Sequence, residues 1–227
     1  MSTSTVDGSG PAQIRPLSAS QERRLVDHVE DKMLQITRSY KKRSLPMSDL
    51  STMIDYLNAT HSVMSLILQI PPVDPSASLR TTLLLRLTGE ALACIPGYVP
   101  DTPSLVALLE WLDDLDKGWL AVLRREPWDP ALRSGVEMPC TEDEHAKPMT
   151  QTERTRLRSL IMSGTDTLEE WLSTQDVERE DFRQALERMG AKQGFDDIFT
   201  RTLGELGSLH GTTLLLDNGA GHPQATA

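Results

Sequence analysis

The sequence predicts an all-α protein, an antiparallel bundle of about six to seven helices with disordered N- and C-terminal tails. Apolar residues recur at helical spacing in every segment between three stretches rich in Pro and Gly, at 71–77, 95–103 and 127–148. No run of four or more residues alternates apolar and polar side chains, and no hairpin turn joins two such runs. The chain has 227 residues, of which 38% are hydrophobic and 25% charged, and this balance is typical of a globular protein.

The first two helices are predicted from their caps and their apolar faces. Ser18 and Gln21 have the spacing of a capping box at the start of the first helix, which ends in the basic run 41–43 at the negative end of the helix dipole. The second helix is expected from about Ser48 to Gln69. Its apolar face is wide, which predicts a central position in the bundle.

The next two helices complete a predicted four-helix core. The third is expected from about Ala77 to Cys94. The fourth begins at Thr102, which we expect to cap it, with Pro103 in its first turn. Its apolar residues are spaced alternately three and four positions apart, which predicts a buried seam. The seam consists of Leu105, Leu108, Leu112, Leu115, Trp119 and Val122.

The C-terminal part of the chain predicts three shorter helices. Thr150 and Glu153 form a second capping box, and the helix that follows is expected to break or kink at Gly164, where Thr167 and Glu170 offer a further cap. Helices at 175–189 and 195–210 follow. The predicted organisation is a disordered arm (1–17), a four-helix core (18–126), an acidic Pro-containing loop (127–149), C-terminal helices packed on the core (150–210) and a flexible tail (211–227).

Charge and cysteine content exclude several classes of protein. The net charge is −10, which argues against a surface built throughout for nucleic acid. Residues 1–50 contain eight basic and six acidic residues, whereas 101–146 contain four and eleven. Cys94 and Cys140 belong to no zinc motif, and we expect the first to pack in a helix and the second to be exposed. Because no secretion signal or membrane span is evident, we expect a cytoplasmic or nuclear protein.

The clearest enzymatic motif is Asp113, Asp114 and Asp116. Isoprenoid synthases hold magnesium with a DDxxD helix, but the fifth position here is Lys117 and no second acidic motif of matching form follows. We therefore interpret these residues as the solvated face of a bundle helix. The acidic run Glu142 to His145 is interpreted as a loop, and His61 as a hydrogen-bonded histidine on an apolar face.

One cluster of basic residues is prominent at the end of the first helix. Arg38, Lys41, Lys42 and Arg43 are candidates for phosphate contacts or for a nuclear import signal. The alternative is that they compensate the helix dipole and keep the chain soluble.

The absence of any recognisable catalytic constellation favours a non-catalytic helical adaptor or complex subunit that docks helices with a protein partner or with a second copy. We expect no cofactor and no metal. The predicted partner-binding residues are Leu112, Leu115, Trp119, Phe199, Leu203 and Leu206. The alternatives are an accessory factor of a nuclear nucleic-acid complex, with phosphate contacts from 38–43, and a metal-dependent all-α enzyme.

Overall fold

The protein is mostly helical in the part of the chain that the computed structural model describes, namely residues 14–45, 47–137, 149–178 and 197–217. These ranges contain six α-helices, one 3-10 helix and one pair of very short strands, which confirms the all-α prediction. The elements are α1 (Ala19–Lys41), α2 (Met53–Leu68), α3 (Ser76–Cys94), η1 (Ile95–Gly97), α4 (Thr102–Leu123), β1 (Trp128–Asp129), β2 (Ser134–Gly135), α5 (Gln151–Glu178) and α8 (Thr200–Asp217).

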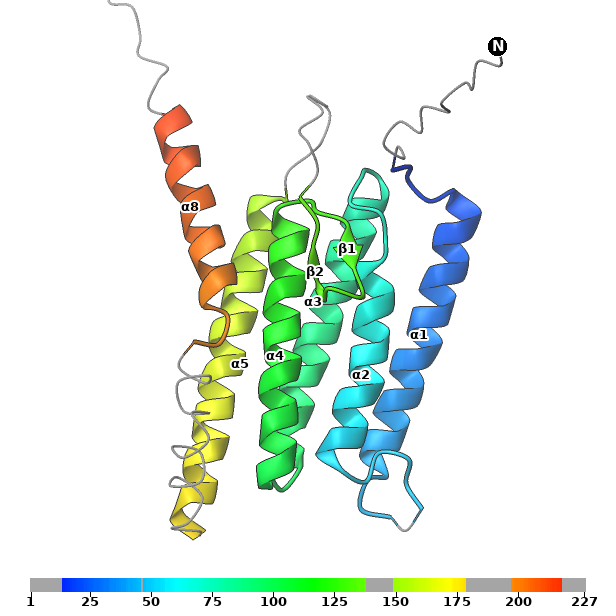
Figure 1. The fold of residues 1–227 in the computed structure, drawn as a ribbon, viewed down its shortest axis with the longest axis vertical. Helices are drawn as coiled ribbons and strands as arrows, with labels where there is room; N and C mark the ends of the chain where they lie inside the picture. The colour runs from blue at the N-terminus through cyan, green and yellow to red at the C-terminus, as the bar shows by residue number, and fades with distance from the viewer. Residues whose placement is uncertain (1–13, 46, 138–148, 179–196, 218–227) are drawn as a thin grey trace, which may run out of the picture.

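The helices lie side by side and alternate in direction along the chain (Figure 1). Helices α2 and α4 pack against each other at the centre, with α1 on the outer side of α2 and α8 on the outer side of α4. Helix α3 packs on α2 and on α5. Within the described ranges, no helix has the length and apolar character needed to cross a membrane.

The core is built mainly from α2, α3 and α4. The predicted seam of α4 is buried along its whole length, and Val122, at its end, is 7% exposed. The wide apolar face predicted for the second helix is also confirmed, since α2 has eight buried residues and packs against α1, α3 and α4. These two helices therefore fix the positions of the remaining ones.

Two helix starts have the predicted caps, and two others differ from the prediction. The Ser18 and Thr150 caps are formed as predicted, each with its partner three residues later. Helix α2 starts at Met53 rather than near Ser48, because Thr52 and Asp55 form a capping box at that point. The cap of α4 is Asp101, whose carboxylate accepts from the Ser104 backbone N–H, and not Thr102.

Helix α5 passes through Gly164 without a break, which corrects the predicted kink. The hydroxyl of Thr167 donates to the carbonyl oxygen of Ser163 instead of capping a new helix. A Cβ atom at Gly164 would lie 2.4 Å from Cδ1 of the buried Leu92. The glycine therefore allows α5 to approach α3 closely. The predicted helix at 175–189 lies largely outside the described residues.

Substituting two helical glycines with alanine is expected to change stability in opposite directions. Gly164→Ala should lower the free energy of unfolding by about 1–2 kcal/mol, because the buried Leu92 must move. Gly204→Ala should raise it by up to about 1 kcal/mol, because nothing lies within 4 Å of the added atom and alanine favours the helix. Urea denaturation of both variants measures the two changes. Equal shifts of the same sign would contradict the close approach of α5 to α3.

Two further features differ from the prediction. The expected loop at 127–149 begins with the antiparallel pair β1 and β2, which is too short to produce an alternating pattern in the sequence. The last helix starts at Thr200 and extends to Asp217, whereas the sequence predicted 195–210. Phe199 adopts a positive φ of 58° and so marks the turn before α8.

Candidate functional site

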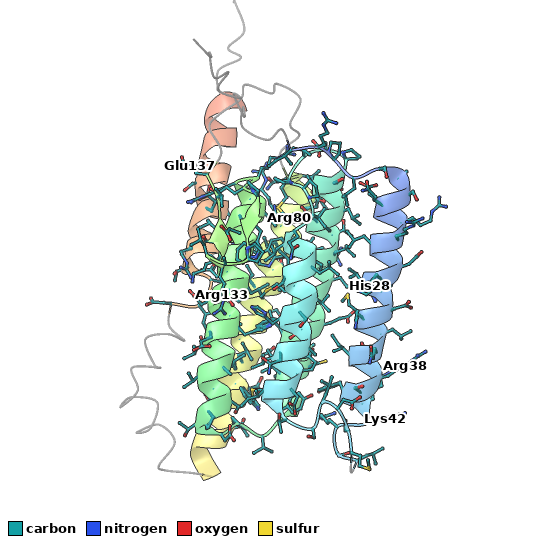
Figure 2. All side chains as sticks on the ribbon, turned by 45° about the vertical axis from the view of Figure 1, so that its right-hand side comes forward. His28, Arg38, Lys42, Arg80, Arg133 and Glu137 are labelled. Carbon is teal, nitrogen blue, oxygen red and sulfur yellow. The ribbon has the colours of Figure 1, made fainter. Side chains whose placement is uncertain are left out.

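The predicted basic cluster forms the last turn of α1 and the residues that follow it, and we call Arg38, Lys41, Lys42 and Arg43 the basic end. The first three side chains are exposed, and Arg38 and Lys42 point away from the bundle (Figure 2). None of these three makes an ion pair with another described residue. Their charges are therefore available to a partner as well as to the helix dipole.

Arg43 has a different role from its neighbours. Its Nε donates to the carbonyl oxygen of Gly97 at 3.0 Å and its Nη1 donates to that of Tyr40 at 3.2 Å. Its guanidinium carbon lies 4.2 Å from the centre of the Tyr40 ring, within the range of a cation–π contact. Arg43 therefore joins the end of α1 to η1, and it is only half-exposed.

Three tyrosines pack against one another next to Arg43. The rings of Tyr40, Tyr56 and Tyr98 have centroids 5.6–5.7 Å apart, and the Tyr98 hydroxyl donates to the carbonyl oxygen of Leu50 at 3.1 Å. Burial raises the pKa of Tyr56 and of Tyr98 well above the ordinary value, so both phenols stay neutral. The neighbouring Cys94 is a half-buried free thiol, as expected, while Cys140 lies outside the described residues.

The structure places the six predicted partner-binding residues in or against the core. Five of them are at most 2% exposed, and Leu203 is half-buried. The five are Leu112, Leu115, Trp119, Phe199 and Leu206. Their contact with a partner remains a prediction, and in this fold their side chains hold α4 and α8 to the bundle.

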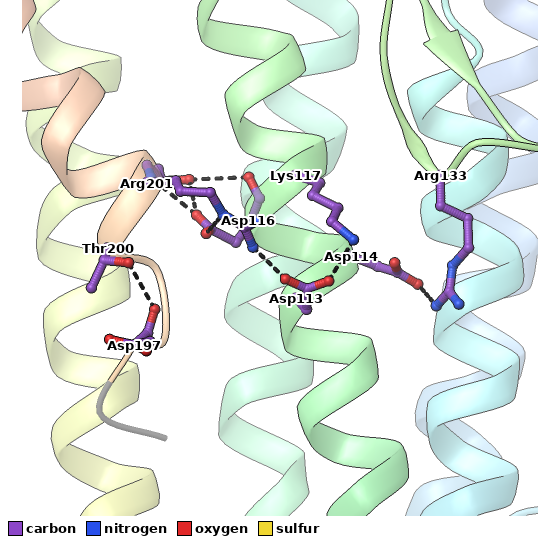
Figure 3. Close-up of polar contacts among 9 residues, drawn as sticks. Asp113, Asp114, Asp116, Lys117, Arg133, Asp197, Thr200 and Arg201 are labelled. Carbon is purple, nitrogen blue, oxygen red and sulfur yellow. Dashed lines mark hydrogen bonds and ion pairs between the residues drawn. The ribbon is translucent and has the colours of Figure 1, made fainter. Parts of the chain in front are cut away.

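The three aspartates of α4, which we call the aspartate layer, are paired with basic side chains from other elements (Figure 3). On the α8 side, Arg201 Nε donates to Asp116 Oδ2 at 2.8 Å, and its Nη2 donates to Asp113. The backbone N–H of Thr202 donates to Asp116 Oδ1 at 3.0 Å, and the Thr202 hydroxyl donates to the same oxygen. Asp116 and Thr202 are both buried.

Asp113 is the exposed member of the layer. Burial alone would raise the pKa of its carboxyl, but Lys117 and Arg201 outweigh this effect and hold the pKa below its usual value. The Lys117 Nζ lies 2.6 Å from Asp113 Oδ2. Lysine at the fifth position of the acidic motif thus neutralises a carboxylate that a magnesium site would need.

Asp114 points to the opposite side of α4. Its Oδ2 accepts from Arg133, in the β1–β2 hairpin, and lies 3.0 Å from Nε2 of His61 on α2. The Asp114 side chain is only 3% exposed. Asp114 therefore ties α4 to both α2 and the hairpin.

The solvated-face interpretation of the acidic motif is consequently wrong for Asp114 and Asp116, which are each 2% exposed. Within the described ranges, no group of three or more His, Cys, Asp or Glu side chains could hold a metal ion. The partners of these carboxylates, Arg133, Arg201 and Thr202, were not predicted from the sequence. Their distance along the chain, 19 residues for Arg133 and 85 for Arg201 with Asp116, leaves no local pattern to detect.

His61 predicts a measurable pH dependence of stability. Burial, followed by the positive charge of Arg133, lowers its pKa below 6.5 in the folded chain. Because the unfolded chain then binds this proton more readily, the free energy of unfolding should fall as the pH drops below about 6.5. The fall should be smaller in His61→Gln than in the wild type, measured by urea denaturation between about pH 5 and pH 7.5.

The matched control is His28→Gln, which changes an exposed histidine of α1. It should keep the pH profile of the wild type. The opposite result would be a free energy of unfolding that rises at low pH in the wild type but not in His61→Gln. In that case the attraction of the Asp114 carboxylate for protonated His61 would outweigh the repulsion from Arg133, and the expected direction would be wrong.

Comparison with known proteins adds one finding. Residues 39–207, well over half of the chain, match the sequence model of TFB6, described as subunit 11 of the general transcription factor TFIIH. The matched range contains the aspartate layer, its basic partners and most of the basic end. No curated protein and no solved structure gives a significant match.

Proposed function

Because this chain belongs to the TFB6 family, that of subunit 11 of the general transcription factor TFIIH, we propose that it is a non-catalytic nuclear subunit of that complex. It acts by docking its helical bundle on other subunits. The observation that carries this proposal is the family match, which runs from the last turn of α1 into α8 and so includes the whole of α2, α3, α4 and α5.

The chemistry of the polar side chains supports a structural role for the one acidic motif. Each aspartate of the aspartate layer is paired with an arginine from a separate segment of the chain. Such pairs fix the relative positions of α4, α8 and the hairpin, and they use the carboxylate oxygens that a metal-dependent reaction would need. We therefore favour the complex subunit over the metal-dependent enzyme.

Purification of the tagged full-length chain from its own cells tests the proposal. We expect the TFIIH subunits to co-purify with it, at stoichiometric amounts by mass spectrometry, and to elute with it on size exclusion. The same tag on an unrelated nuclear protein of similar size is the control. Elution as a 25.2 kDa monomer, or as an assembly of this chain alone, would contradict the proposal.

A second experiment tests whether the chain is non-catalytic. Adding the purified chain to TFIIH that lacks it should change neither the set of reactions nor their dependence on metal ions. If a new activity appeared and was lost in Asp113→Asn, which alters the most exposed carboxylate of the motif, the chain would be an enzyme.

A further inference from the structure

We infer that one end of the bundle is a docking surface for an acidic segment with apolar side chains on another subunit of the complex. This inference rests on the proposed function. The surface, which we call the docking end, lies where the α1–α2 and α3–α4 connections meet (Figure 1). Its members are Arg38, Lys41, Lys42, Leu45, Met47 and Val99.

Apolar side chains are unusually exposed at the docking end. The exposed fractions are 56% for Leu45, 99% for Met47 and 73% for Val99. Ile54 and Val106 are also exposed, near the starts of α2 and α4 at the same end of the bundle (Figure 1). Thus five of the nine exposed large apolar side chains in the described ranges lie in the two connections or near the helix starts that follow them. Such a group marks an interaction surface more often than single exposed residues do.

The two connections that carry these side chains are held together. Arg43 donates to the carbonyl oxygen of Gly97, and the hydroxyl of Tyr98 donates to that of Leu50. The first contact joins the end of α1 to η1, and the second joins the α1–α2 connection to the residue before Val99. A partner therefore meets a surface that is already organised, which reduces the entropy cost of binding.

The charge of the docking end identifies the chemistry of the partner. Arg38, Lys41 and Lys42 are exposed and unpaired within the described ranges, in a chain whose net charge is −10. An acidic segment complements these three cations, and its apolar side chains cover Leu45 and Met47. Nucleic acid would satisfy the cations but would leave the apolar side chains without a matching surface.

The acidic stretch of this chain is attached far from the docking end. Residues 138–148 connect Glu137 to the residues before α5, and both Glu137 and the start of α5 lie at the opposite end of the bundle (Figures 1 and 2). A connection of that length extends about 20 Å from its attachment points, whereas α4, with 22 residues, is about 33 Å long. Residues 179–196 contain four basic and four acidic residues, so they offer no complementary charge. The occupant is therefore expected on another subunit.

Zero-length cross-linking of the intact complex tests this inference. A carbodiimide joins a lysine amine directly to a carboxylate that forms an ion pair with it, and this chain has only six lysines. We expect Lys41 or Lys42 to be coupled to Asp or Glu of another TFIIH subunit, in a segment that also contains apolar residues. Coupling of these lysines only within this chain, or to no protein, would overturn the inference.

Matched variants give an independent measurement. TFIIH purified from cells that lack the chain is titrated with Lys41→Glu/Lys42→Glu and, separately, with Met47→Gly. We expect at least about tenfold weaker binding for the first variant and a smaller loss for the second. Met47 has a positive φ of 69°, so glycine there relieves backbone strain and does not unfold the chain.

The controls change the same chemistry elsewhere on the bundle. Arg23→Glu/Arg24→Glu makes an equal change of charge in the first turns of α1, and Leu132→Ser removes an apolar side chain that is 69% exposed in the hairpin. Both should bind as the wild type does. Equal loss in controls and test variants would overturn the inference.

The remaining outcomes separate this inference from the proposed function. If the wild-type chain joins TFIIH and the docking-end variants join it equally well, the surface is wrong and the subunit role stands. If the wild-type chain does not join TFIIH, the subunit role itself fails. If the chain instead binds DNA in a manner that requires Lys41 and Lys42 and weakens steeply in salt, the occupant is nucleic acid and the inference is wrong.

Discussion

Replacing Asp116 with alanine is expected to lower the free energy of unfolding by about 3 kcal/mol and to detach α8 from the bundle. The buried carboxylate accepts from Arg201 and from both the backbone N–H and the hydroxyl of Thr202. Thr202 is fully buried, so its backbone N–H would lose its partner without gaining water, whereas its hydroxyl can still donate to the backbone carbonyl oxygen of residue 116. Arg201 contributes less, because its side chain is 45% exposed and solvent can replace the lost contact.

Asp113→Ala is the matched control for this prediction. It removes a carboxylate that also pairs with Arg201, but the Asp113 side chain is 44% exposed. We expect a change of less than about 1 kcal/mol. Urea denaturation followed by circular dichroism measures both variants, and hydrogen exchange reports whether α8 has lost protection. Similar losses for the two variants would show that burial of Asp116 does not hold α8 in place.

Replacing Trp119 with alanine is expected to lower the free energy of unfolding by about 3–5 kcal/mol. The indole is fully buried between α4 and α3, and its Nε1 donates to the Thr88 hydroxyl at 3.1 Å. The substitution leaves a large cavity and removes the donor to the Thr88 hydroxyl, which still donates to the carbonyl oxygen of Leu84. Leu203→Ala, at a half-buried position of α8, should cost less.

This experiment also decides how one predicted partner-binding residue acts. If Trp119→Ala is as stable as the wild type but no longer co-purifies with TFIIH, Trp119 acts by contacting a partner. Its burial in the free chain would then not explain the loss. If the variant loses stability as expected, its effect on assembly follows from the fold. Denaturation and co-purification of the same protein sample distinguish the two results.

Local patterns in the sequence predicted most of the fold. Two of these patterns are the capping box of Ser18 and Gln21 and the leucine seam of α4. Each depends on residues within one or two turns of one another, and both predictions are confirmed. The i,i+4 geometry of α3 also brings Arg86 and Glu90 together, with Nε and Oε1 2.8 Å apart. Such features depend only on residues that are close in the sequence.

The candidate site was less predictable because its contacts join distant residues. The motif at Asp113 to Asp116 has the composition of a solvated face, and nothing near it in the sequence identifies Arg201 or Arg133 as a partner. The docking end presents a related difficulty. Leu45 and Val99 belong to separate connections, which are joined by the contact of Arg43 with Gly97. Only the folded chain brings these groups together.

The contact between Arg201 and α4 also bears on the order of folding. Arg201 and Asp116 are 85 positions apart in the sequence, so closing this loop costs more chain entropy than closing the short connections between α2, α3 and α4. Helix α8 is therefore expected to dock after the core has formed, and the carboxylate of Asp116 stays hydrated until it does.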